Sequence, residues 1–226
     1  MPLDLERIRG LCFDVDGTIS DTDDAWVERI ARRIAPLEKI AKPGQARRLA
    51  RWLVMFSESP MNAVYYTMDA LSFDDNMARL FDRFARKKGG SGTKFLLMAG
   101  AQELLDAARS RYPLSVVSAR DARTTGHFLQ QFSLQEHFVE VVTSQTCEHT
   151  KPFADPILFA AERMQVPPET CLMIGDTTVD ILAGRRAGAQ TVGLLCGFGT
   201  ERELRRAGAD LILHDLHELH ALLFSK

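Results

Sequence analysis

The feature that most constrains this chain is the stretch over residues 13–18, which reads FDVDGT. It follows apolar residues, so we predict that it ends a short buried strand over residues 11–15. Because residues two apart on an extended chain project to the same side, Asp14 and Asp16 would crowd one place at the strand tip, which is unfavourable without a cation or a proton between them. Strand tips are where open α/β sheets bind ligands. The stretch therefore predicts a divalent-metal site with a carboxylate nucleophile beside an acid/base carboxylate.

Length and charge limit the classes of protein to which this chain can belong. Its 226 residues suit one domain, or one domain with a modest insert, and 46% hydrophobic residues are enough for a sizeable core. The net charge of -2 gives no electrostatic case for binding nucleic acid or a membrane. Residues 1–9 contain no apolar signal-peptide segment, and no apolar run approaches the roughly 20 residues that cross a bilayer. We expect a cytoplasmic protein.

The four cysteines lack the paired spacing that is typical of a disulfide framework or a zinc site. Cys12, Cys171 and Cys196 lie in apolar, strand-like runs, and Cys147 lies just beyond one. We expect all four to be reduced residues in or near the core, which agrees with the expectation of a cytoplasmic protein.

Apolar runs that are typical of strands alternate with patterns that are typical of helices in most of the chain. The predicted strands cover residues 11–15, 114–118, 139–143, 171–174, 191–195 and 210–213. The predicted helices cover residues 102–111, 124–131, 155–165, 179–187 and 201–207. We expect Asp155 to be an N-cap and Gly188 to follow a helix C-terminus. The alternation implies an α/β, Rossmann-like fold with a parallel sheet covered by helices on both faces.

Residues 21–91 differ from the rest, because their apolar residues recur at helical spacing without a strand-like run between them. Near the end of this region, residues 87–92 read KKGGSG, which is typical of a hinge or linker. We therefore predict two parts. Residues 1–20 and 92–226 would form an α/β core, and residues 21–91 would form an all-helical insert.

Polar side chains follow four of the predicted strands. Asp14 and Asp16 follow the first, Ser118 ends the second, Lys151 follows the third, and Asp176 and Asp180 follow the fourth. Taken singly, a strand-end aspartate is usually a turn or cap residue, and Lys151 or Asp180 would be an ordinary surface residue. Taken together, they would supply a nucleophile, an acid/base, a hydroxyl, a cation and metal ligands to one crevice. That set matches the needs of phosphoryl transfer.

In this order, the four segments resemble those of the haloacid dehalogenase-like hydrolase superfamily, and the insert resembles its small helical cap. A C-terminal stretch that begins with Gly197-Phe198-Gly199 and continues through residues 203–210 resembles the phosphoglycolate-phosphatase-like branch. The resemblance covers essentially the whole chain, although the cap carries no readable motif.

The resemblance implies a role for each acidic residue. Asp14 would attack phosphorus and form an aspartyl-phosphate, and Asp16 would protonate the leaving oxygen and then activate the hydrolytic water. Mg²⁺ would be held by the carboxylates of Asp14 and Asp176 and by the backbone carbonyl of Asp16. Asp180 would orient either a metal-bound water or Lys151.

The resemblance also implies how the phosphoryl group is bound. Ser118 would bind one of its oxygens, and Lys151 would neutralise charge on the phosphoryl group and on the nucleophile. Backbone N–H groups of Val15, Asp16 and Ala119 would complete the cradle around the phosphoryl oxygens.

The function that follows is a Mg²⁺-dependent phosphatase for a small phosphomonoester, with phosphoglycolate-like molecules, sugar phosphates, nucleotides and pyrophosphate as candidates. A sugar phosphomutase would use the same core but would need a cap that excludes water. A non-catalytic phosphate-binding module is a third alternative, although the complete set of site residues argues against it. A haloacid dehalogenase would not need Asp16, and a phosphonate hydrolase would need a cap lysine, for which Lys39 and Lys42 are unmarked candidates.

Overall fold

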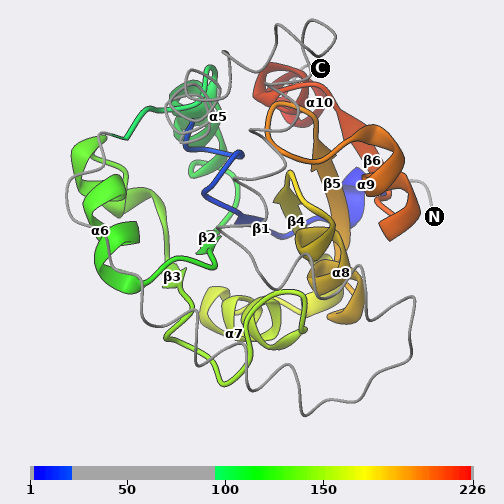
Figure 1. The fold of residues 1–226 in the computed structure, drawn as a ribbon, viewed down its shortest axis with the longest axis horizontal. Helices are drawn as coiled ribbons and strands as arrows, with labels where there is room; N and C mark the ends of the chain where they lie inside the picture. Colours follow the sequence, from blue (N-terminus) through cyan, green and yellow to red (C-terminus); the bar gives the residue numbers. More distant parts are fainter. Residues whose placement is uncertain (1–2, 22–94, 225–226) are drawn as a thin grey trace, which may run out of the picture. The chain divides into compact units, whose positions relative to one another are not determined.

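The computed structural model describes residues 3–21 and 95–224, and these residues build a parallel sheet between helices (Figure 1). The strands are β1 (Gly10–Phe13), β2 (Leu114–Val117), β3 (Glu140–Val142), β4 (Cys171–Gly175), β5 (Gln190–Leu194) and β6 (Leu211–Leu213). Their order is β3-β2-β1-β4-β5-β6, and every pairing is parallel. The chain moves outward from β1 in one direction and then from β4 in the other. The tips of β1 and β4 therefore flank the switch point where such sheets bind ligands.

Helices cover both faces of the sheet, as predicted. They are α5 (Ala101–Ala108), α6 (Ala122–Gln131), α7 (Asp155–Met164), α8 (Thr178–Arg186), α9 (Glu201–Ala207) and α10 (Leu216–Phe224), with short 3-10 turns η1 (Leu5–Arg7), η3 (Gln135–His137) and η4 (Pro168–Thr170). On one face, α7 packs against β1, β2 and β3, and α8 packs against β4 and β5. Towards the other face, α5 packs against α10. The observed core confirms the predicted α/β, Rossmann-like class.

Successive side chains of β1 alternate between two apolar cores, one on each side of the sheet. Leu11 and Phe13 join the core that includes side chains of α5, α6 and α10, whereas Cys12 joins the core that includes side chains of α7 and α8. All three side chains are fully buried. A strand that is buried on both faces needs a continuous apolar run, which is why β1 could be recognised in the sequence.

The predicted strands and helices are present, with ends that differ by a few residues. Because β1 ends at Phe13, Asp14 and Asp16 lie in the turn after the strand and not within it. The prediction that Asp155 is an N-cap is wrong by one position, since Ala154 occupies the cap and Asp155 is the first helical residue. Gly188 follows the C-cap of α8 with a φ of 78°, as predicted. Helix α10 was not predicted.

The two connections to the predicted cap run side by side where they leave the sheet. The N–H of Asp21 donates to the carbonyl of Leu96 at 2.9 Å, and the N–H of Met98 donates to the carbonyl of Ile19 at 3.0 Å. Residues 22–94 lie outside the described residues, and so do Lys39, Lys42 and the linker over residues 87–92. The domain boundaries and the all-helical cap therefore stay predictions.

The cysteines lie where the sequence predicted them. All four are free thiols; Cys12 and Cys171 are buried, and Cys147 and Cys196 are partly buried. Across residues 3–21 and 95–224, no helix combines the length and the apolar character that crossing a membrane requires.

We predict that Asp121→Ala destabilises the protein, because Asp121 caps the helix that follows the β2 tip. Its carboxylate accepts hydrogen bonds from the N–H of Thr124 at 2.9 Å and from the Thr124 hydroxyl at 2.7 Å. Loss of such a cap lowers the free energy of unfolding by about 1 kcal/mol, whereas Asp121→Asn keeps an acceptor and most of the stability. Denaturant titration measures both variants, and an Ala variant as stable as the Asn variant would contradict the prediction.

Candidate active site

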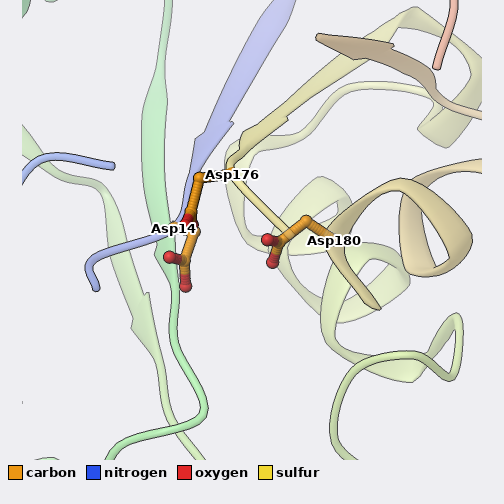
Figure 2. A group of neighbouring side chains, drawn as sticks. All are labelled: Asp14, Asp176 and Asp180. Carbon is orange, nitrogen blue, oxygen red and sulfur yellow. The ribbon is translucent and has the colours of Figure 1, made fainter. Parts of the chain in front are cut away.

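The side chains that were predicted to act together do converge at the carboxyl ends of the central strands. Asp14 directly follows β1, Ser118 follows β2 and Asp176 follows β4. Strand β1 pairs with both β2 and β4, so these three tips are neighbours. Lys151 lies in the loop between β3 and α7. Asp180 lies in the first turn of α8, and its side chain is drawn with those of Asp14 and Asp176 in Figure 2.

The ammonium group of Lys151 lies between two carboxylates. Its Nζ donates hydrogen bonds to Asp14 Oδ1 and to Asp180 Oδ1, each at 2.6 Å. The side chain of Lys151 is only 3% exposed. Burial acts to lower the pKa of Lys151, but Asp14 and Asp180 outweigh it and raise the pKa above its ordinary value. The lysine therefore remains a cation in a place that water barely reaches.

Asp180 is fixed by the start of its own helix. Thr177 is the N-cap of α8, and its backbone N–H and hydroxyl donate to Asp180 Oδ2 at 3.0 and 2.6 Å. This is the reciprocal cap that a Thr-x-x-acid sequence provides. Because the cap uses Oδ2 of Asp180, its Oδ1 can accept the hydrogen bond from Lys151. The alternative that Asp180 is a surface residue is wrong, because its side chain is 1% exposed.

Asp176 is held by backbone from distant parts of the chain. The N–H of Phe198 donates to its Oδ2 at 2.7 Å, the hydroxyl of Thr18 donates to its Oδ1 at 3.3 Å, and the N–H of Gly199 donates to its carbonyl at 3.0 Å. A Cβ built on Gly197 or Gly199 would lie 2.1 Å from an Asp176 oxygen, and one on Gly17 would lie 2.4 Å away. Only glycine allows these segments to approach Asp176 so closely.

The three buried carboxylates form a group that could hold a metal ion. Asp14, Asp176 and Asp180 each offer an oxygen within 4.8 Å of the others (Figure 2). Burial raises the pKa of Asp14 to about 7; Asp180 and Asp16 add to the rise, and Lys151 opposes it. A cation would relieve this repulsion, and an oxygen-only donor set suits a hard ion such as Mg²⁺. The predicted metal role of the Asp16 carbonyl stays a prediction.

Asp16 has a partner that sequence reasoning missed. Its carboxylate forms an ion pair with the guanidinium of Arg120, and the two side chains are 25% and 13% exposed. Sequence analysis did not single out Arg120. The signal that could have found it is a cation two residues beyond Ser118, on the strand tip next to that of β1.

The predicted phosphoryl-binding residues lie around the same tips. Ser118 is 4% exposed, and its Oγ accepts a hydrogen bond from the N–H of Arg120 at 3.1 Å. The Val15 carbonyl accepts N–H groups from residues 18–20, which closes the turn after β1. Ala119 is exposed beside Ser118. The N–H contacts that Val15, Asp16 and Ala119 would make to a phosphoryl group stay predictions.

Comparison with known proteins gives a family match over most of the chain. The model of the family described as haloacid dehalogenase-like hydrolase matches residues 11–194. A phosphoglycolate phosphatase from Shigella boydii is 26% identical over 234 residues, which covers 95% of this chain and 92% of that protein.

Solved structures share the fold at low sequence identity. A predicted phosphatase from Clostridium acetobutylicum has a TM-score of 0.69 and 20% identity, with 97% of this chain and 99% of that chain covered. A haloacid dehalogenase-like family protein from Streptococcus pneumoniae has a TM-score of 0.67 and 23% identity, with 96% and 99% covered. The parallel sheet and its flanking helices are therefore an architecture that these proteins share.

We predict that Gly199→Ala destabilises the protein and weakens binding of divalent cations. The added Cβ would meet the backbone carbonyl of Asp176 at 2.1 Å, and backbone cannot move away as a flexible side chain can. The expected loss in the free energy of unfolding is about 1–3 kcal/mol. Denaturant titration and calorimetric titration with Mg²⁺ measure the two effects.

The matched control is Gly126→Ala, in α6. Within the described residues, no atom beyond its chain neighbours and its own helix backbone lies within 4 Å of a Cβ built there, so alanine should raise the free energy of unfolding by about 0.5–1 kcal/mol and leave cation binding unchanged. If both variants changed stability in the same direction, the proposed crowding around Asp176 would be wrong.

Proposed function

The chain belongs to the haloacid dehalogenase-like hydrolase family and is a phosphoric monoester hydrolase, and we propose that it hydrolyses a small phosphomonoester through an aspartyl-phosphate on Asp14. The observation that carries this proposal is the buried Lys151 ammonium, 2.6 Å from both Asp14 and Asp180, whose carboxylates each lie within 4.8 Å of that of Asp176. A carboxylate nucleophile, a fixed cation and further carboxylates for a metal are the groups that phosphoryl transfer requires.

In the first step, an oxygen of Asp14 forms a bond to phosphorus while the bond from phosphorus to the ester oxygen breaks. Asp16 gives a proton to that oxygen, which leaves as an alcohol. In the second step, Asp16 takes a proton from a water molecule whose oxygen attacks phosphorus. The bond to Asp14 then breaks, and inorganic phosphate is released.

Lys151, Ser118 and a bound metal ion are proposed to support these steps without forming or breaking bonds. Lys151 neutralises charge on Asp14 and on the phosphoryl oxygens, and its ion pair with Asp180 keeps it aimed at them. Ser118, almost fully buried at the tip of β2, is proposed to bind a phosphoryl oxygen through its hydroxyl. Asp14 and Asp176, with the carbonyl of Asp16, would hold Mg²⁺, which when bound supplies further neutralisation of the phosphoryl charge.

The substrate is proposed to be a small phosphorylated metabolite. Similarity to a phosphoglycolate phosphatase at 26% identity makes a phosphoglycolate-like molecule the first candidate. The predicted cytoplasmic location, the absence of nucleic-acid binding and the discrimination by a cap over residues 21–91 remain predictions from the sequence.

The test is phosphate release from a panel of metabolite phosphates and from p-nitrophenyl phosphate. We expect release that needs Mg²⁺ and stops when a chelator is added. Asp14→Asn should abolish turnover with the fold retained, as judged by circular dichroism, because an amide is a poor nucleophile. Turnover by Asp14→Asn would refute the assignment of the nucleophile. Bisphosphate-dependent isomerisation without net phosphate release would favour the mutase, and binding without turnover would favour the non-catalytic module.

Asp16→Asn should separate the two steps. The p-nitrophenolate ion leaves without a proton, so the first step should persist and release nitrophenol in a burst equal to the amount of enzyme. Steady-state turnover should then fall by about 100-fold or more, because the amide cannot activate water. Rapid-mixing absorbance measures the burst, and steady turnover at the wild-type rate would exclude the acid/base role.

A further inference from the structure

Arg120 is the second cation at the strand tips, and the residues around it fix its position. Its backbone N–H donates to Ser118 Oγ at 3.1 Å, and its carbonyl accepts the N–H of Ser144 at 2.9 Å. Its guanidinium lies over the ring of Phe95, 5.1 Å from the ring centroid, and forms an ion pair with Asp16. Phe95 is itself 7% exposed and packs edge-to-face against Phe128, so the ring under Arg120 belongs to the core.

We propose that Arg120 binds a second anionic group of the substrate, so that the substrate is a short phosphomonoester whose leaving group carries a carboxylate or another phosphate. The inference rests on the proposed function, because it uses the assignment of Asp16 to the leaving oxygen. It adds a binding residue that neither the sequence motifs nor the resemblance supplied.

Lys151 and Arg120, which both lie in the described part of the chain, face different parts of a substrate. Lys151 contacts the nucleophile Asp14 and is 3% exposed, so it belongs to the phosphoryl side. Arg120 contacts Asp16, the proposed acid for the ester oxygen, and so belongs to the leaving-group side. An anion on Arg120 would lie beside a carboxylate that must itself reach the ester oxygen. Only a few atoms can therefore separate that anion from the phosphorus.

The chemistry of guanidinium suits this task. The guanidinium carbon lies over the Phe95 ring, and the N–H donors of a guanidinium point outward in its plane. The N–H edges of a guanidinium match the two oxygens of a carboxylate or a phosphate, and one of them already donates to Oδ1 of the Asp16 carboxylate. A substrate oxyanion would exchange with Asp16 at the guanidinium, which would release the Asp16 carboxyl toward the ester oxygen. The partial exposure of both side chains permits that exchange.

The test compares two phosphonates of similar size, which resist hydrolysis because carbon replaces the ester oxygen. 3-Phosphonopropionate ends in a carboxylate, and propylphosphonate ends in a methyl group. Calorimetric titration with saturating Mg²⁺ gives both dissociation constants. Wild-type protein should bind 3-phosphonopropionate about tenfold or more tightly than propylphosphonate, since hydrogen bonds between charged groups have effects of that order. A bisphosphonate of the same length then tells whether carboxylate or phosphate is preferred.

Arg120→Gln should reduce the ratio of the two dissociation constants to near one. Arg120→Lys keeps the charge but not the paired N–H donors of the guanidinium, so it should retain part of the preference. The matched control is Arg123→Gln, which removes the same charge from an exposed position in α6 and should leave the preference intact. Circular dichroism checks the fold of each variant.

The outcomes separate this inference from the proposed function. Equal affinity of wild-type protein for the two phosphonates, no binding of 3-phosphonopropionate, or an unchanged preference in Arg120→Gln would each overturn the role of Arg120, even if phosphomonoesters are hydrolysed. An equal loss of preference in Arg123→Gln would also overturn it, because the effect would then be general electrostatics. Absence of phosphate release from every phosphomonoester would instead overturn the proposed function, whatever the phosphonates do.

Discussion

The ion pairs of Lys151 with Asp14 and Asp180 are the interaction on which the rest of the site depends. A buried ammonium is unfavourable unless carboxylates compensate for the water it has lost, and breaking one such pair leaves an uncompensated buried charge. These two ion pairs connect the end of β1, the loop before α7 and the first turn of α8. The carboxylate of Asp176 lies within 4.8 Å of those of Asp14 and Asp180. A bound cation would reduce the repulsion among these three groups.

Close backbone packing around Asp176 is the second constraint, and it explains glycines far apart in the sequence. Gly17 lies in the turn after β1, while Gly197 and Gly199 lie between β5 and α9. A side chain at any of them would enter the space of Asp176. The thiol of Cys196 also donates to the carbonyl of Gly17 at 3.6 Å, so the same two segments are joined beside Asp176. The N–H of Phe198 and the hydroxyl of Thr18 help to orient this carboxylate.

The sheet and most of its site were predictable because they depend on local patterns. Buried strands give continuous apolar runs that can be recognised in the sequence. Because the ends of adjacent parallel strands lie side by side, the sequence predicted that Asp14, Lys151, Asp176 and Asp180 would lie close together. The pairing of Arg120 was harder to predict, because its position two residues beyond Ser118 places it near the strand tips but does not show which side chain its guanidinium contacts. Helix α10 (LHELHALLF) was missed although it has a local start signal, since Asp215 accepts the N–H groups of His217 and Glu218. The pairing of Arg120, by contrast, depends on long-range packing that a single sequence does not encode locally.

Lys151 and Arg120 are proposed to have different roles, because their side chains are buried and paired to different extents. Lys151 is paired with both Asp14 and Asp180 and is almost fully buried, so it is proposed to act only on the nucleophile and the phosphoryl group. Arg120 lies over a ring of the core but is paired with a carboxylate that remains one-quarter exposed. The fixed position of Lys151 suits contact with the phosphoryl group, which is the same in every substrate. The more accessible position of Arg120 suits a contact that is made with each substrate and lost again when the product leaves. Part of the selectivity for the leaving group is therefore proposed to lie in the core itself, on the tip of β2.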